Sequence, residues 1–172
     1  MNDMNTILRT SRLILRRPRS DDVAAMHAIL RDPLAMRYWS TLPHTTMAES
    51  EAWVTKTIDA INAGECDDFF VEHDGLLIGK AGLWNRNEIG FLFSPAVWGK
   101  GFAREALQAV IGHAFGERGH EEIRAEADPR NERCLRLLLR LGFRETGRAE
   151  RTYHIGGEWS DSVYLSLAKP RT

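Results

Sequence analysis

The sequence predicts an α/β fold in which helices flank a central mixed β-sheet. Apolar residues switch along the chain between helical spacing and strand alternation, in the order β-α-α-α-β-β-β-α-β-α-β-β. A strand–glycine loop–helix–strand unit lies near the middle, and such a unit predicts two parallel strands joined by a right-handed crossover. The chain has 172 residues and no internal repeat or linker. Positions 1–172 are therefore expected to form one domain.

The first third of the chain is expected to be mostly helical. Alternation over Ser11–Arg17 predicts a strand, and apolar residues from Val23 to Leu30 recur at helical spacing. Asp32–Ser40 is expected to form a short helix or a turn. Thr46 and Glu49 form a capping-box pair that opens a further helix, which Gly64 closes.

Three strands are predicted next, over Phe69–Val71, Leu76–Trp84 and Ile89–Phe93. The turn sequences His73–Gly75 and Asn85–Asn87 separate them. This part of the chain should therefore form an antiparallel meander.

Two helices and three strands complete the expected order. Apolar residues from Gly101 to Gly116 share one helical face, Ile123–Ala127 reads as a strand, and a second helix runs from Cys134 to Gly142. The last two strands, Arg148–Ile155 and Ser162–Leu167, flank a Gly-Gly turn and predict a hairpin.

Composition excludes several classes of protein. The formal net charge of −1 gives no overall attraction to nucleic acid or to anionic membranes. Met1–Leu8 lacks the apolar core of a signal peptide, no run approaches membrane-spanning length, and two cysteines make no disulfide framework. A cytoplasmic protein is expected. His113, Glu117 and His120 do not have zinc-ligand spacing, so no metal is expected.

The segment Trp98–Ala106 carries the clearest chemical signal. Gly99 and Gly101 follow an apolar strand and open an amphipathic helix. Glycine lets the backbone approach a ligand closely, and the first amides of a helix have no partner within it. These donors, together with the positive end of the helix dipole, predict a pyrophosphate site.

Several segments in the correct order resemble the GNAT acetyltransferases, and more narrowly the branch that contains the ribosomal-protein acetyltransferases RimJ and RimL. The family's loop pattern falls on Trp98, Gly101 and Ala103, with Trp98 in place of the usual polar residue. The other matching segments are Arg12–Arg16, Glu88–Pro95, Asn131–Cys134, Leu141–Phe143 and Gly157–Asp161.

The resemblance implies that the chain binds acetyl-CoA. In that interpretation Phe91, Leu92 and Phe93 hold the pantetheine arm by strand-like hydrogen bonds. The pyrophosphate lies against the loop, and Asn131 touches the lower part of the cofactor arm. The loop residues concerned are Trp98, Gly99, Lys100, Gly101, Phe102, Ala103 and Arg104.

Two residues are candidates for proton transfer. Glu88 begins the cofactor strand, where several GNAT enzymes carry a catalytic glutamate; the alternative is an exposed carboxylate at a strand start. The position that carries a tyrosine acid in many GNAT enzymes is Leu138 here. Cys134 is therefore considered as the acid, and it is equally readable as a small buried residue.

The acceptor is expected to be a primary amine, and the resemblance favours the α-amine of a peptide or protein. Tyr38, Trp39, Trp84 and Tyr153 are the candidate acceptor contacts. A small amine such as an amino acid, a polyamine or an antibiotic is the alternative, and so is a non-catalytic acyl-CoA sensor. A monomer or a homodimer is expected.

Overall fold

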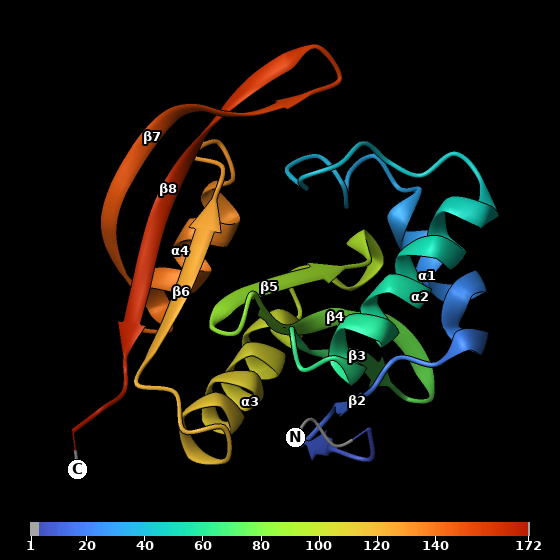
Figure 1. Cartoon of the computed structure of the whole chain (residues 1–172), viewed down its shortest axis with the longest axis horizontal. Coiled ribbons are helices and arrows are strands. Elements are labelled where there is room, and N and C mark those ends of the chain that lie inside the picture. The colour runs from blue at the N-terminus through green and yellow to red at the C-terminus, as the bar shows by residue number, and fades with distance from the viewer. Residues whose placement is uncertain (1–3, 172) are drawn as a thin grey trace.

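The computed structural model describes residues 4–171, so positions 1–3 and 172 of the expected domain lie outside it. The strands are β1 (Ile7–Arg9), β2 (Ile14–Arg16), β3 (Asp67–His73), β4 (Leu76–Trp84), β5 (Glu88–Phe93), β6 (Glu122–Ala127), β7 (Arg144–Ile155) and β8 (Glu158–Ala168). The α-helices are α1 (Val23–Leu30), α2 (Met47–Asn62), α3 (Phe102–Gly116) and α4 (Glu132–Arg140). Figure 1 shows their arrangement.

The eight strands form one mixed sheet in the order β1-β2-β3-β4-β5-β6-β8-β7. Among the described strands, only β5 and β6 pair in parallel, and a single registered pair, Glu88 with Arg124, joins them. Beyond that pair the two strands diverge (Figure 1). The predicted parallel unit is therefore confirmed, and it opens a gap in the sheet's pairing toward the end of β5.

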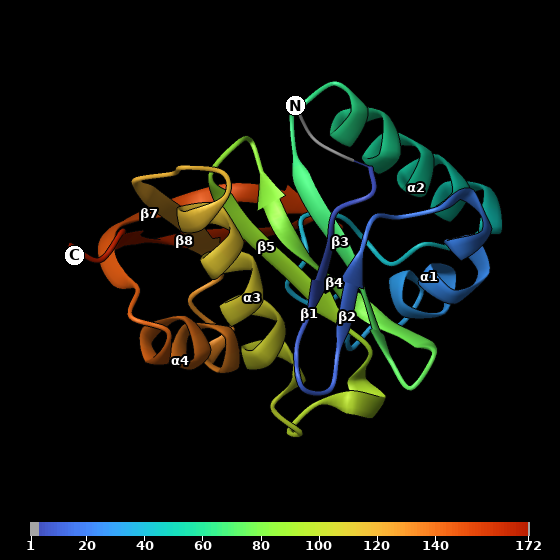
Figure 2. The same cartoon turned by 90° about the horizontal axis from the view of Figure 1, so that it is seen from below.

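Apolar side chains cover both faces of the sheet. Helices α3 and α4 lie on one face and α1 and α2 on the other (Figure 2). Phe69 of β3 and Leu107 of α3 belong to one core cluster, whereas Phe70 of β3 packs with Leu30 of α1 and Val54 of α2 in another. Successive side chains of β3 thus point to opposite faces of the sheet and contribute to the core on each face.

Asp32–Ser40, expected to be a short helix or a turn, forms turns, since the Asp32 carboxylate accepts hydrogen bonds from the amides of Leu34 and Ala35 at 2.8 and 3.3 Å. Two strands differ from the expectation. The strand β1 was not predicted, because three residues at a sheet edge give too short a pattern. The strand β7 begins at Arg144, earlier than its alternation indicated.

The β7–β8 hairpin carries an irregularity that bends it over the sheet. The register of the pair shifts between Ala149 and Tyr153, and Arg151 has a φ of +51°. The amide of Arg151 donates to Asp161 Oδ1 at 2.9 Å, which holds this conformation. A β-bulge of this kind changes the direction in which the following side chains point.

The hairpin tip packs against the loop that joins α1 to α2. A Cβ atom built on Gly156 would lie 3.0 Å from Cδ2 of Leu42. In Figure 1 the tip of β7 and β8 extends toward this loop above the diverging strands. The loop and the hairpin therefore close one side of the gap.

Candidate active site

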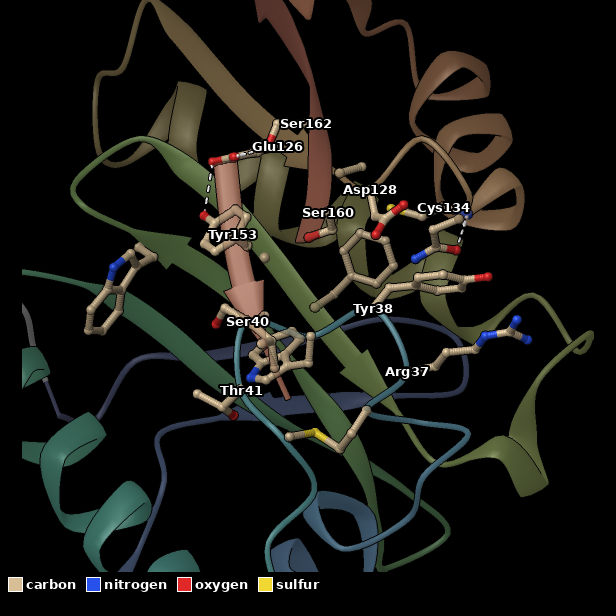
Figure 3. A pocket seen from close by; sticks show the side chains of 18 of the residues that line it. Arg37, Tyr38, Ser40, Thr41, Glu126, Asp128, Cys134, Tyr153, Ser160 and Ser162 are labelled. Carbon is tan, nitrogen blue, oxygen red and sulfur yellow. Dashed lines mark hydrogen bonds between the residues drawn. The ribbon is translucent and has the colours of Figure 1, made fainter. Parts of the chain in front are cut away.

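A cavity of about 680 Å³ lies where β5 and β6 diverge. The α1–α2 loop, β5, β6, the start of α4 and the β7–β8 hairpin all contribute side chains to it. Figure 3 shows part of this lining. The cavity brings together many residues that sequence reasoning selected separately: Tyr38, Trp39, Trp84, Glu88, Phe91, Asn131, Cys134 and Tyr153.

Glu88 opens β5 at the point where the strands begin to separate. Its side chain is half-buried, and among residues 4–171 none donates a hydrogen bond to its carboxylate. Burial raises its pKa above the ordinary value, and the negative charge of Glu126 adds to the effect. A carboxylate in this state is suited to accept a proton.

Glu126 of β6 was not selected from the sequence. Its carboxylate accepts hydrogen bonds from Ser162 Oγ at 2.5 Å and from the Tyr153 hydroxyl at 3.3 Å (Figure 3). In β6 the residues Ile123, Ala125 and Ala127 are buried, so alternation places Glu126 on the opposite face. That alternation was available in the sequence, but the partners on β7 and β8 were not.

Cys134 lies in the first turn of α4. Asn131 is the N-cap of this helix, and its Oδ1 accepts a hydrogen bond from the Cys134 amide at 3.3 Å. Burial raises the pKa of the Cys134 thiol to about 12. Leu138, one turn later, is buried and also lines the cavity, so this part of α4 presents no tyrosine hydroxyl.

The aromatic residues of the cavity lie beside cations. The guanidinium of Arg130 lies 5.8 Å from the ring centre of Tyr38, and the ammonium of Lys80 lies 5.6 Å from that of Trp39. Arg130 also pairs with Asp128 at 2.7 Å and with Glu158 at 2.6 Å. Arg130 thus links the α4 side of the cavity to the hairpin and to the α1–α2 loop.

The glycine loop lies outside this cavity, beyond the far end of β5. Gly99 and Gly101 have φ values of +76° and +80°, which only glycine adopts without strain. Within the described chain, the backbone N–H groups from Gly99 to Arg104 donate no hydrogen bond. The side chain of Arg104 is exposed at the start of α3. This donor set fits a pyrophosphate.

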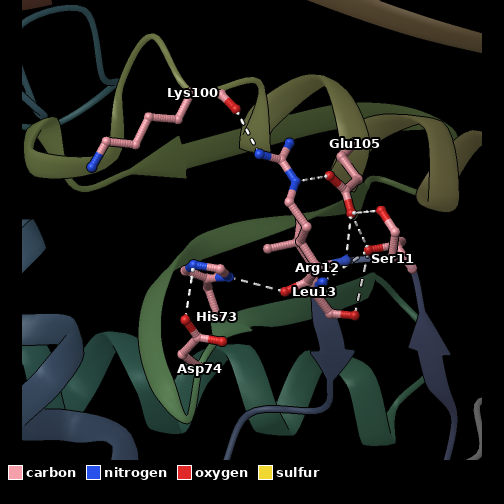
Figure 4. A network of polar contacts seen from close by, with 8 residues as sticks. Ser11, Arg12, Leu13, His73, Asp74, Lys100 and Glu105 are labelled. Carbon is pink, nitrogen blue, oxygen red and sulfur yellow. Dashed lines mark hydrogen bonds and ion pairs between the residues drawn. The ribbon is translucent and has the colours of Figure 1, made fainter.

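A polar cluster fixes the start of α3 to the β1–β2 turn (Figure 4). Glu105 accepts hydrogen bonds from Thr10 Oγ1 at 2.6 Å and from Arg12 Nε at 2.7 Å. Arg12 Nη1 in turn donates to the carbonyl of Lys100 at 2.9 Å. Arg12 thus connects Glu105 in the first turn of α3 to the Lys100 carbonyl in the glycine loop.

Trp98 contacts both sides of the divergence. Its indole N–H donates to the Phe93 carbonyl at 3.0 Å, and the Arg133 guanidinium lies 4.8 Å from its ring centre. Trp98, which stands where the family usually has a polar residue, thus connects the end of β5 to the start of α4.

The strand β5 presents one edge to the divergence. Its other edge pairs with β4, where Phe91, Leu92 and Phe93 lie opposite Ala81, Lys80 and Gly79. The side chains of Leu92 and Phe93 are buried in the core, whereas Phe91 lines the cavity. Any role of Leu92 and Phe93 toward a pantetheine arm therefore falls to the backbone, whereas Phe91 also offers its side chain.

Residues 4–171 contain no group of three or more His, Cys, Asp or Glu side chains arranged to hold a metal ion. Within the same range no helix is long and apolar enough to span a bilayer.

The sheet, its divergent parallel pair and the glycine loop together define an acyltransferase architecture. The family model of the acetyltransferase (GNAT) domain matches residues 12–144, which is more than half of the chain. The chain belongs to the GNAT acetyltransferases, and members of this family are enzymes that bind acetyl-CoA.

Individual relatives cover almost the whole chain. An uncharacterized N-acetyltransferase, p20 of Bacillus licheniformis, is 28% identical over 170 residues, which span 94% of this chain and 96% of p20. The spermidine N-acetyltransferase of Vibrio cholerae, in complex with CoA and spermine, is 25% identical, with a TM-score of 0.81 over 92% of this chain and 96% of that structure. The ribosomal L7/L12 α-N-protein acetyltransferase RimL shares the fold at 17% identity, with a TM-score of 0.87 over 98% of this chain and 97% of that structure.

Proposed function

We propose that this enzyme transfers the acetyl group of acetyl-CoA to the α-amine of a peptide or protein N-terminus. The observation that carries the proposal is the position of Glu88, whose carboxylate has a raised pKa and no hydrogen-bond donor among residues 4–171. Glu88 lies where β5 and β6 are still paired, and beyond the far end of β5 the amides of Gly99–Arg104 have no partner in the same part of the chain. The first feature suits proton removal and the second suits a diphosphate.

The cofactor would lie along the open edge of β5. The amides of Gly99–Arg104 would hold the pyrophosphate, with Lys100 and Arg104 adding positive charge. The backbone of Phe91–Phe93 would bond the pantetheine amides as an added strand does, and Asn131 would contact the arm from the opposite side.

Acetyl-CoA supplies the acetyl group as a thioester. Glu88 removes one proton from the acceptor's ammonium ion, and the neutral nitrogen forms a bond to the carbonyl carbon. Backbone N–H groups near Leu92 and Phe93 stabilise the developing oxyanion. As the carbon–sulfur bond breaks, the nitrogen loses its second proton and the departing sulfur gains one. The products are an amide and a free thiol, and the proton on Glu88 returns to solvent.

An α-amine suits a cavity that offers one candidate general base, because little base is needed to make it neutral. Its pKa is about 8, against about 10.4 for a lysine side chain, so a larger share is neutral near pH 7. Among residues 4–171, Glu88 is the cavity carboxylate that has no hydrogen-bond donor and whose pKa is raised. The rings of Tyr38, Trp39, Trp84 and Tyr153 would pack against the first side chains of the peptide.

A small polyamine is the second candidate. Six carboxylates line the cavity against four basic side chains, and two of those four, Lys80 and Arg130, already pair with cavity carboxylates. The remaining negative charge suits a polycation. The Vibrio cholerae spermidine N-acetyltransferase, at 25% identity, supports the same choice.

An acceptor screen tests the proposal and separates the candidates. Purified protein is incubated with acetyl-CoA and tetrapeptides of varied first residue, free amino acids, diamines or polyamines, and thiol release is followed. We expect the highest kcat/KM with a tetrapeptide. N-acetylated forms of the same tetrapeptides serve as controls and should give no thiol. Preference for polyamines would favour the second candidate, and CoA binding without thiol release from any amine would identify a non-catalytic sensor.

A further inference from the structure

Glu126 and Glu88 face the same cavity from the two strands that diverge there. Their surroundings differ. Glu126 accepts two hydroxyl hydrogen bonds, from Ser162 and Tyr153, whereas no described residue donates to Glu88. Two donors offset the cost of holding a charged carboxylate away from water. Two donors thus hold Glu126 in place, whereas Glu88 has none among the described residues.

The hairpin supplies the parts that hold Glu126. Thr152 Oγ1 lies 2.6 Å from Ser162 Oγ, so the Ser162 proton can point to Glu126 while its oxygen accepts from Thr152. The bulge at Arg151, held by Asp161, precedes both Thr152 and Tyr153 and turns them toward β6. A non-glycine residue at positive φ is strained, and such positions gather at functional sites.

We propose that Glu126 is a positioning residue that binds the ammonium group of the acceptor and holds it against Glu88. This inference rests on the proposed acetyl transfer to an amine. The ammonium ion forms an ion pair with Glu126 and passes one proton to Glu88, and the neutral nitrogen stays beside Glu126 as it attacks the thioester. Two like charges in one cavity favour a cation between them.

The titratable groups around this pair come from three strands. Three titratable side chains lie around Glu126: that of Glu88 on β5, that of Tyr153 on β7 and that of Tyr164 on β8. Tyr164 is the direct cross-strand partner of Glu126. Burial and the charge of Glu126 raise the pKa of Tyr153 to about 12, so Tyr153 remains a neutral donor near pH 7. A change in the charge at Glu126 should therefore alter chiefly the pKa of Glu88.

The test compares Glu126→Gln with the matched variant Glu122→Gln, which changes the same residue type on the same strand outside the cavity. Carboxyl-carbon NMR of the CoA-bound protein follows the titration of Glu88. We expect Glu126→Gln to lower the pKa of Glu88, because a neighbouring negative charge is lost, and Glu122→Gln to leave it unchanged. An unchanged Glu88 titration in Glu126→Gln would overturn the proposal.

Ligand binding gives a second readout that requires no acetyl transfer. n-Butylammonium is compared with 1-pentanol, a neutral molecule of similar size. The cation should shift the Glu126 resonance of the parent protein, bind about tenfold more weakly to Glu126→Gln, as expected for a lost charge-assisted hydrogen bond, and bind Glu122→Gln as it binds the parent.

The two-ligand comparison in the parent needs no variant, so it decides the matter even if Glu126→Gln does not fold. Equal shifts of Glu126 by the cation and the alcohol would contradict the proposal. Butylammonium binding at Glu126 in a protein that acetylates no amine in the screen would refute the proposed function and leave the ammonium site standing.

Discussion

The carboxylate of Glu88 has no hydrogen-bond donor in the described part of the chain, and burial and Glu126 raise its pKa. Its effect on catalysis should depend on pH. As pH rises, Glu88 ionises and becomes a base, but the acceptor amine also becomes neutral without help. The contribution of Glu88 is therefore greatest at pH values below the pKa of the acceptor amine.

Glu88→Gln should lower kcat/KM by roughly 100-fold near pH 7, at the lower end of what a general base supplies. The deficit should shrink toward pH 9, where an α-amine is largely neutral. Initial rates of thiol release across this pH range measure both effects. Glu121→Gln, an exposed carboxylate before β6, is the control. A deficit that stays constant with pH would argue against a base.

Cys134 shares the cavity with Glu88, but its thiol is a poor proton donor there. Burial raises its pKa to about 12. An ordinary thiol has a pKa of about 8.5, so transfer from Cys134 to a departing thiolate is uphill. Its role as the acid remains a sequence-based hypothesis.

We expect Cys134→Ala to retain turnover within about threefold of the parent, which corresponds to about 0.65 kcal/mol, because a thiol of raised pKa contributes little as an acid. Steady-state kinetics and calorimetric CoA titration should be run on the same preparation. A 100-fold loss of kcat with unchanged CoA affinity would restore Cys134 as the acid.

At the scale of elements, the β1–β2 turn is fixed to the start of α3 through Glu105. Burial alone would raise the pKa of Glu105, but hydrogen bonds from Thr10, Arg12 and Ser11 outweigh it and lower the pKa to about 2. A depressed folded-state pKa stabilises the protein above the ordinary value of 4.5, and the stabilisation is lost as pH falls from there toward 2.

Glu105→Gln should therefore cost on the order of 1 to 2 kcal/mol of unfolding free energy at pH 7 and roughly half as much at pH 3. Urea unfolding at the two pH values gives both numbers. Glu65→Gln, exposed after α2, should cost little at either pH. An equal cost of Glu105→Gln at pH 3 and pH 7 would mean that its charge is not what stabilises the turn.

The same elements show how far sequence reasoning reaches. Local patterns predicted the bounds of β4, the cap at Thr46 and the parallel unit around the glycine loop, because each depends on neighbours in sequence. The resemblance supplied the cavity-lining candidates. Glu126 and Arg130 were missed, because their roles arise from partners on β7, β8 and the α1–α2 loop. The edge strand β1 was missed because its pattern is only three residues long.

For the whole molecule, the divergence of β5 and β6 makes the free energy of unfolding depend on whether a ligand is bound between the two strands. A ligand that bridges β5, the glycine loop and α4 binds only the folded chain. At 100 times its Kd such a ligand stabilises by about 2.7 kcal/mol.

CoA should accordingly raise the melting temperature by several degrees, as expected for a domain of this size. Arg104→Glu should reduce that rise, since it places negative charge beside the pyrophosphate. Arg140→Glu, an equal charge change at the C-terminal end of α4, should preserve it. Differential scanning fluorimetry with and without CoA compares the three proteins, and an undiminished rise in Arg104→Glu would separate the loop from the diphosphate.

Because only the pair between Glu88 and Arg124 joins β5 to β6, the sheet consists of two blocks of different size. Strands β1–β5 form one antiparallel block and β6–β8 another. Blocks joined so sparsely are natural units of partial unfolding. Without its cofactor the protein should exchange amide hydrogens in two separate groups, and a cofactor lying across the junction would merge them into one cooperative body.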